Sequence, residues 1–213
     1  MQGRGLIFSL LRAPSSPPRY QMMYRDIAYR ELMLKSNPKK WSDVAGLQAI
    51  TLTIGMEDTR LEKTIAEKWE LLLHLLALEH VGGRPATFIA SPNKHYAEKS
   101  VGVKVTLTDS AMWDFLEKLV YLVLPNQIGF EGASQPRRDS TYIPFHEFPT
   151  SIVDLKVSNL LLYPDFEQDF ALFESLRGMQ VRIEVQRASK GRMTTMLMSA
   201  LALPLVPPVR GDP

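Results

Sequence analysis

Hydrophobic and polar side chains alternate in four separate segments of the chain. In "LQAITLTIG" (47–55), Ile50, Leu52 and Ile54 alternate with two threonines. The same two-residue period occurs in three further segments, 101–108, 153–158 and 179–186. Because successive side chains of a β-strand point to opposite faces of its sheet, each segment predicts a strand with one apolar and one polar side.

A period of about 3.6 residues predicts four helices between and around these strands. A short one contains Met23 to Leu34 and closes before Pro38, and a last one contains Met193 to Leu201. The longest begins at Asp58 or Thr59 and ends at Gly82-Gly83. One stripe of this longest helix is expected to face the core, and it consists of Leu61, Ile65, Trp69, Leu72 and Leu76.

The segment 109–125 predicts a helix directly after the second strand. Asp109 or Ser110 is expected to cap its start, and Pro125 is expected to stop it. Its single apolar face consists of Met112, Phe115, Leu116, Leu119 and Val120. The elements together predict an α+β fold: a mixed or antiparallel sheet with helices packed on one face, the other face open and polar.

Charge is distributed unevenly along the chain, whose formal net charge is +2. Residues 1–40 carry eight of the 25 Lys and Arg but only two of the 23 acidic residues, so 41–213 carry 17 basic and 21 acidic residues, a net −4. The first 25 residues contain no acid and include "RAPSSPPR". This composition favours an organellar transit segment over a disordered basic tail that binds a polyanion. We expect a basic N-terminal extension with a short helix (1–40), one α+β domain (41–205) and a Pro-rich tail (206–213).

Several kinds of chemistry find no support in the sequence. Without cysteine the chain has no disulfide, no thiolate zinc site and no thiol nucleophile. No apolar run approaches the roughly 18 residues of a membrane span, so no membrane contact is expected. The four histidines have no metal-ligand spacing and are interpreted as surface or boundary residues: His74, His80, His95 and His146. We therefore expect no enzyme, no cofactor and no metal.

Six segments resemble one known family in order and spacing. They are "AITLTIG" (49–55), "VGGRP" (81–85), "VGVKVTLTDSAMWDFLEKL" (101–119), "LPNQIGFEGAS" (124–134), "YPDFE" (163–167) and "RGMQVRI" (177–183). Over roughly residues 47–205 the chain resembles the L-five family of universal large-subunit ribosomal proteins, in its bacterial and organellar form. The combination of "GVKVTL", a Met-Trp-x-Phe helix and a later "RGM" is more specific than any single segment.

The resemblance implies a non-enzymatic component of the central protuberance of the large ribosomal subunit. Its implied partners are large-subunit rRNA, 5S rRNA where the ribosome contains it, and neighbouring ribosomal proteins. A loop is implied to reach a small-subunit head protein and, transiently, the peptidyl-site tRNA. Polar and cationic side chains on an open sheet suit this role, because they bind phosphates and ribose hydroxyls.

Residues are carried over from the family segment by segment. The rRNA-binding candidates are Thr51, Thr53, Gly55, Lys104, Thr106, Arg137, Arg138, Lys156 and Arg182. Among them, Lys104 and Arg182 are the preferred phosphate contacts. The loop that faces tRNA and the small subunit is represented by Asn93, Lys94, His95, Tyr96 and Lys99.

The chain departs from the family in its charge. Thr53 stands where the family usually has Asn, and the loop between Phe88 and Gly102 is less basic than in the family. Counterion release depends on the number of cations that meet phosphates, so a body of net charge −4 indicates fewer RNA contacts. The favoured interpretation is a divergent mitochondrial member of the matrix ribosome, held mainly by neighbouring proteins. The alternatives are a plastid or bacterial cytoplasmic member, an RNA-poor protein–protein adaptor, or a small hydrolase.

Overall fold

The structure is a computed structural model. It describes residues 16–38, 43–55, 68–90, 100–130, 132–133, 151–174, 176, 178–186 and 191–205.

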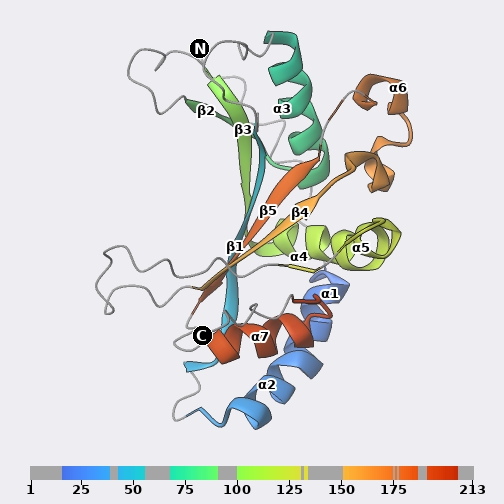
Figure 1. The fold of residues 1–213 in the computed structure, drawn as a ribbon. Coiled ribbons are helices and arrows are strands. Elements are labelled where there is room, and N and C mark those ends of the chain that lie inside the picture. Colours follow the sequence, from blue (N-terminus) through green and yellow to red (C-terminus); the bar gives the residue numbers. More distant parts are fainter. Residues whose placement is uncertain are drawn as a thin grey trace, which may run out of the picture.

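Five strands within these residues form one antiparallel sheet (Figure 1). Their bounds are β1 Gly46–Gly55, β2 Thr87–Ala90, β3 Ser100–Leu107, β4 Ser151–Val157 and β5 Met179–Gln186. The strand order is β2-β3-β1-β5-β4, so β1 occupies the centre. The four predicted strands are confirmed. β2 was not predicted because it is a four-residue edge strand with three exposed side chains and no alternation.

Helices pack on one face of the sheet, as the alternation predicted (Figure 1). Two short 3₁₀ turns, Leu160–Leu162 and Pro164–Phe166, precede α6. The helices are α1 Arg19–Met23, α2 Tyr29–Ser36, α3 Lys68–Gly82, α4 Asp109–Lys118, α5 Leu124–Asn126, α6 Phe170–Phe173 and α7 Gly191–Ala200. One π-helical turn, Tyr24–Ala28, joins α1 to α2, and another, Leu119–Val123, joins α4 to α5. The α+β fold is therefore confirmed. No helix in the described parts of the chain is long and apolar enough to span a bilayer.

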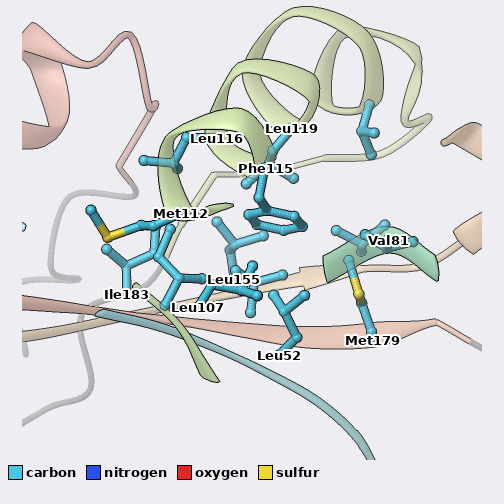
Figure 2. Packing of buried hydrophobic residues seen from close by; sticks show 14 of the residues in the cluster. Leu52, Val81, Leu107, Met112, Phe115, Leu116, Leu119, Leu155, Met179 and Ile183 are labelled. Atoms are coloured by element: carbon cyan, nitrogen blue, oxygen red, sulfur yellow. The ribbon is translucent and has the colours of Figure 1, made fainter. Parts of the chain in front are cut away.

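The core lies between the apolar side of the sheet and these helices. Figure 2 shows Phe115 and Leu116 of α4 above Leu52, Leu155 and Ile183 of the strands. All five predicted apolar residues of this helical segment are buried. Burying one such side chain contributes roughly 1.5–3 kcal/mol, so the alternation itself determines which face of the sheet is covered.

The predicted core stripe of α3 is wrong. Leu72 and Leu76 are each 41% exposed, whereas Leu78 and Val81 are buried. His74, interpreted as a surface or boundary residue, is also buried. The segment "LLLHLLALEHV" is apolar on almost every side, so its periodicity gives no direction for the buried face. The other stripe positions have no described side chain.

The ends of α4 also differ from the prediction. The N-cap is Thr108, whose side chain makes no capping hydrogen bond, in place of Asp109 or Ser110. Pro125 does not stop the helix but lies in the first turn of α5. Proline is tolerated there because the first turn does not need its missing N–H.

The N-terminal helical unit, residues 19–36, shares the core of the sheet domain. Tyr20 and Leu32 are buried in it. The Tyr20 hydroxyl donates a hydrogen bond of 2.6 Å to the Leu201 carbonyl oxygen, and Arg19 pairs with Glu117 at 3.3 Å. The unit therefore holds the two ends of the described chain together. The predicted domain boundaries at residues 40 and 205 stay predictions.

Candidate nucleic-acid interface

The strand register aligns polar residues in rows across the face of the sheet that is turned away from α3 and α4 (Figure 1). One row follows from four Cα pairings: Thr87 with Lys104, Lys104 with Thr53, Thr53 with Gln180, and Gln180 with Lys156. It crosses all five strands and contains two cations and no acid. We call these five residues the lysine row.

The adjacent row contains an ion pair. It consists of Thr106, Thr51, Arg182 and Asp154 in successive pairings. Arg182 Nε donates to Asp154 Oδ1 at 2.8 Å, and Nη2 donates to Oδ2 at 3.2 Å. This hydrogen bonding raises the pKa of Arg182 above its ordinary value, against an opposing effect of burial. We call these four residues the paired row.

A third row is acidic. Glu184 of β5 lies opposite Ala49 of β1 and Ile152 of β4. The open face thus changes along the strands from cationic at the lysine row, through neutral at the paired row, to acidic at Glu184. A polyanion is attracted to the cationic end of such a gradient and repelled from the acidic end.

A pair of glycines borders the lysine row, where Gly55 of β1 lies opposite Gly102 of β3. A Cβ atom on Gly102 would lie 2.6 Å from the Ile54 carbonyl oxygen, whereas one on Gly55 would meet nothing within 4 Å. Gly102 is therefore required by the close approach of the two strands. No such contact requires glycine at position 55.

Six of the predicted rRNA-binding residues lie together on this face, namely Thr51, Thr53, Lys104, Thr106, Lys156 and Arg182. Gly55 ends β1 beside them. Arg137, Arg138 and the loop residues Asn93, Lys94, His95, Tyr96 and Lys99 lie outside the described residues. Their roles stay predictions.

Three residues of the face were not among the candidates. Gln180 belongs to an alternation that the sequence displays, so its polar orientation was available as a signal. Thr87 lies on β2, which has no such signal. The pairing of Asp154 with Arg182 depends on the β4–β5 register, which the sequence does not specify.

Other chemistry has little basis in the described parts of the chain, where no three His, Asp or Glu side chains gather as metal ligands. His80 has a structural environment. Its Nε2 lies 2.7 Å from the Asp165 carbonyl oxygen, and its ring stacks against Phe166 and Phe173.

Comparison with known proteins identifies the family. The C-terminus of the ribosomal L-five family, the family of the uL5 proteins, matches residues 100–205, from β3 to the residues after α7. The chain belongs to the ribosomal L-five family. This match includes Lys104, Lys156 and Gln180 of the lysine row.

Relatives in the L-five family extend the similarity to β1 and the N-terminal helices. The large ribosomal subunit protein uL5 of Mycoplasma capricolum is 26% identical over 191 residues, covering 87% of this chain and 97% of the relative. The large ribosomal subunit protein uL5m of Reclinomonas americana is 26% identical over 198 residues, covering 88% and 97%. The uL5 of Symbiobacterium thermophilum is 34% identical over 104 residues, covering 49% and 51%.

Membership in the L-five family confirms the resemblance seen in the sequence. The expectation of a large-subunit ribosomal protein that is not an enzyme is confirmed with it, because the proteins of this family are ribosomal components. The small hydrolase considered as an alternative is thereby excluded.

Proposed function

We propose that the protein is a structural constituent of the large ribosomal subunit that binds rRNA through the lysine row. The supporting observation is that a row of Lys, Thr and Gln side chains without an acid crosses the uncovered face of the sheet of an L-five family protein. Lysine ammonium groups neutralise phosphates, while threonine and glutamine side chains hydrogen-bond phosphate oxygens and ribose hydroxyls.

The rRNA contact is small, and neighbouring proteins supply much of the binding. The paired row has no net charge and Glu184 repels phosphate, so the favourable part of the face is limited to its cationic end. A structure of the assembled particle tests this division. An rRNA footprint that exceeded the protein interfaces and covered Glu184 would contradict it.

The location in the central protuberance, and the contacts with a small-subunit head protein and the peptidyl-site tRNA, come from the family resemblance. Residues 93–99 are the proposed tRNA-side loop, and 5S rRNA is a partner where the ribosome contains it. Crosslinking from residues 94 and 99 within ribosomes tests these contacts, and crosslinks to large-subunit proteins alone would exclude them.

The proposed compartment is the mitochondrial matrix. Its support is the acid-free, arginine-containing start of the chain and the similarity to an organellar relative, the uL5m of Reclinomonas americana. A reporter carrying residues 1–40 at its N-terminus is expected to enter mitochondria. Tagged full-length protein should then comigrate with large subunits in a sucrose gradient of mitochondrial lysate, and protein confined to the top of the gradient would contradict the proposal.

RNA binding by the full chain tests the lysine row directly. The double variant Lys104→Gln, Lys156→Gln should flatten the dependence of log K on log salt concentration by roughly 0.7–0.9 for each phosphate that is no longer neutralised. Lys35→Gln is the matched control, because Lys35 pairs with Glu31 on α2, away from the sheet. Equal slopes for the wild type and the double variant would show that this face does not bind the RNA.

A further inference from the structure

We propose that Asp154 is an intramolecular competitor of RNA phosphate, which binds the guanidinium of Arg182 and so sets the number of phosphates that the open face neutralises. The inference deepens the rRNA-binding role proposed above and rests on it. It gives Asp154 a specificity role and predicts that Arg182, although cationic and on the correct face, contributes no phosphate contact.

The geometry of the pair is that of phosphate recognition. Arg182 offers Nε and Nη2 side by side to the two carboxylate oxygens of Asp154, at 2.8 and 3.2 Å. A guanidinium binds a phosphate through the same fork of parallel N–H groups. One fork cannot serve both groups, so a phosphate must displace Asp154 before it can bind there.

The sheet itself holds the two partners together. Asp154 and Arg182 are directly opposite each other in the antiparallel β4–β5 register. Opposite residues of neighbouring strands have their Cβ atoms about 4.5–5.5 Å apart, so the pair forms without ordering a loop. The competitor is therefore present at the site permanently and at high local concentration.

Electrostatics strengthens the competition. The side chains are partly exposed, 53% for Arg182 and 33% for Asp154, so the pair itself contributes at most about 1 kcal/mol to stability. Its larger effect is that a neutral pair condenses no counterions, and phosphate binding there would release none. Lys104 differs, since among the described residues no carboxylate lies within ion-pair distance of it.

The experiment measures binding of the full chain to a short fluorescein-labelled RNA hairpin by anisotropy over a series of salt concentrations. Asp154→Asn should release Arg182 and steepen the log K against log salt slope by roughly 0.7–0.9, one phosphate. Between about 50 and 200 mM salt its affinity should then fall about threefold more than that of the wild type. Arg182→Gln alone should leave the wild-type slope unchanged.

Two further variants separate release of Arg182 from a general change in charge. Asp154→Asn, Arg182→Gln should return to the wild-type slope, because the released cation is gone. Glu184→Gln removes one negative charge from the same face while both members of the pair remain. A steeper slope that persists in the double variant, or that Glu184→Gln reproduces in full, would overturn the inference.

The remaining outcomes distinguish this inference from the proposed function. A wild-type chain without salt-dependent RNA binding refutes the rRNA-binding role itself. A wild-type chain that binds, with an Asp154→Asn variant of equal slope, refutes only the competition. Circular dichroism melting verifies folding of each variant, and a second variant, Asp154→Ser, guards against a specific effect of the asparagine amide.

Discussion

Gly102 lies where β1 and β3 approach too closely for a side chain. Replacing Gly102 by Ala places a Cβ atom 2.6 Å from the Ile54 carbonyl oxygen and 3.0 Å from the Gly55 Cα, both of which are backbone atoms that cannot rotate away. We expect the free energy of unfolding to fall by about 1–3 kcal/mol, as for other overpacked sites. Urea unfolding measures it. Gly55→Ala is the matched control, and an equal loss in both variants would refute the steric explanation.

Two buried tyrosines differ in whether the hydroxyl is hydrogen-bonded. Tyr20 donates to the Leu201 carbonyl oxygen, whereas the Tyr163 hydroxyl has no hydrogen bond within the described structure. Tyr20→Phe should therefore cost about 1–3 kcal/mol at neutral pH, because it leaves a buried carbonyl unsatisfied. Tyr163→Phe should cost less. Chemical denaturation of both variants decides the order, and a larger loss for Tyr163→Phe would contradict it.

The same tyrosines make the protein sensitive to alkali. Burial raises the pKa of Tyr163 and of Tyr20 above the ordinary value of 10.0, and nearby charged or ionisable groups raise both further. Between pH 10 and these raised values the unfolded chain loses protons that the folded chain keeps, so the free energy of unfolding falls as pH rises. Urea midpoints from about pH 8 to 11.5 should decline less steeply in Tyr163→Phe. A parallel decline in variant and wild type would contradict this linkage.

At the residue scale, alternation in the sequence was sufficient to place Thr51, Thr53 and Lys104 on one face. It could not reveal that Arg182 is paired, because Asp154 lies 28 positions away and meets it only through strand register. A prediction from single residues therefore counted Arg182 as a phosphate contact of the same kind as Lys104. Register converts a list of cations into a pattern of available and occupied ones.

At the scale of elements, α3 tests which side of a nearly uniform apolar helix is buried. Leu78→Ala should lower the free energy of unfolding by about 2–5 kcal/mol, since Leu78 is completely buried and its removal leaves a cavity. Leu76→Ala should change it by less than about 1 kcal/mol, because Leu76 is on the exposed side. Thermal or urea unfolding compares the two. The reverse order would support the stripe inferred from the sequence.

Elements with a clear period were predicted well, and those without one were not. The alternation of β1, β3, β4 and β5 identified each strand, and the apolar face of α4 was correct at all five positions. β2 lacks alternation because both of its sides are largely exposed at the sheet edge. The turn Leu119–Val123 carried no signal either, since a π-helical turn preserves the same buried residues as an α-helix.

At the scale of the whole molecule, the sheet separates two functions. Its apolar side and the helices supply the stability, while its polar side is left for a partner (Figure 1). Net charge alone would have argued against RNA binding, because residues 41–213 carry more acid than base. The lysine row resolves this conflict by concentrating cations on one end of one face, where association depends on local and not on total charge.

The N-terminal helical unit offers a test of how far the folding domain extends. Its Tyr20, Ala28 and Leu32 are all buried, and Tyr24 packs 4.9 Å from Trp113 between ring centroids. A chain that begins at residue 38 should lose several kcal/mol relative to one that begins at residue 16, because burial of each large apolar side chain contributes roughly 1.5–3 kcal/mol. Both chains lack residues 1–15, so the comparison isolates the helices.

Tryptophan fluorescence during urea unfolding measures that loss, since Trp113 lies against the unit. The matched pair within the complete chain is Leu32→Ala, at a buried position, and Leu34→Ala, at a position 85% exposed. The truncation and Leu32→Ala should both destabilise, while Leu34→Ala should not. If the chain beginning at residue 38 unfolded at the same urea concentration as the longer chain, the helices would be an appendage, and the domain boundary predicted at residue 40 would be the physical one.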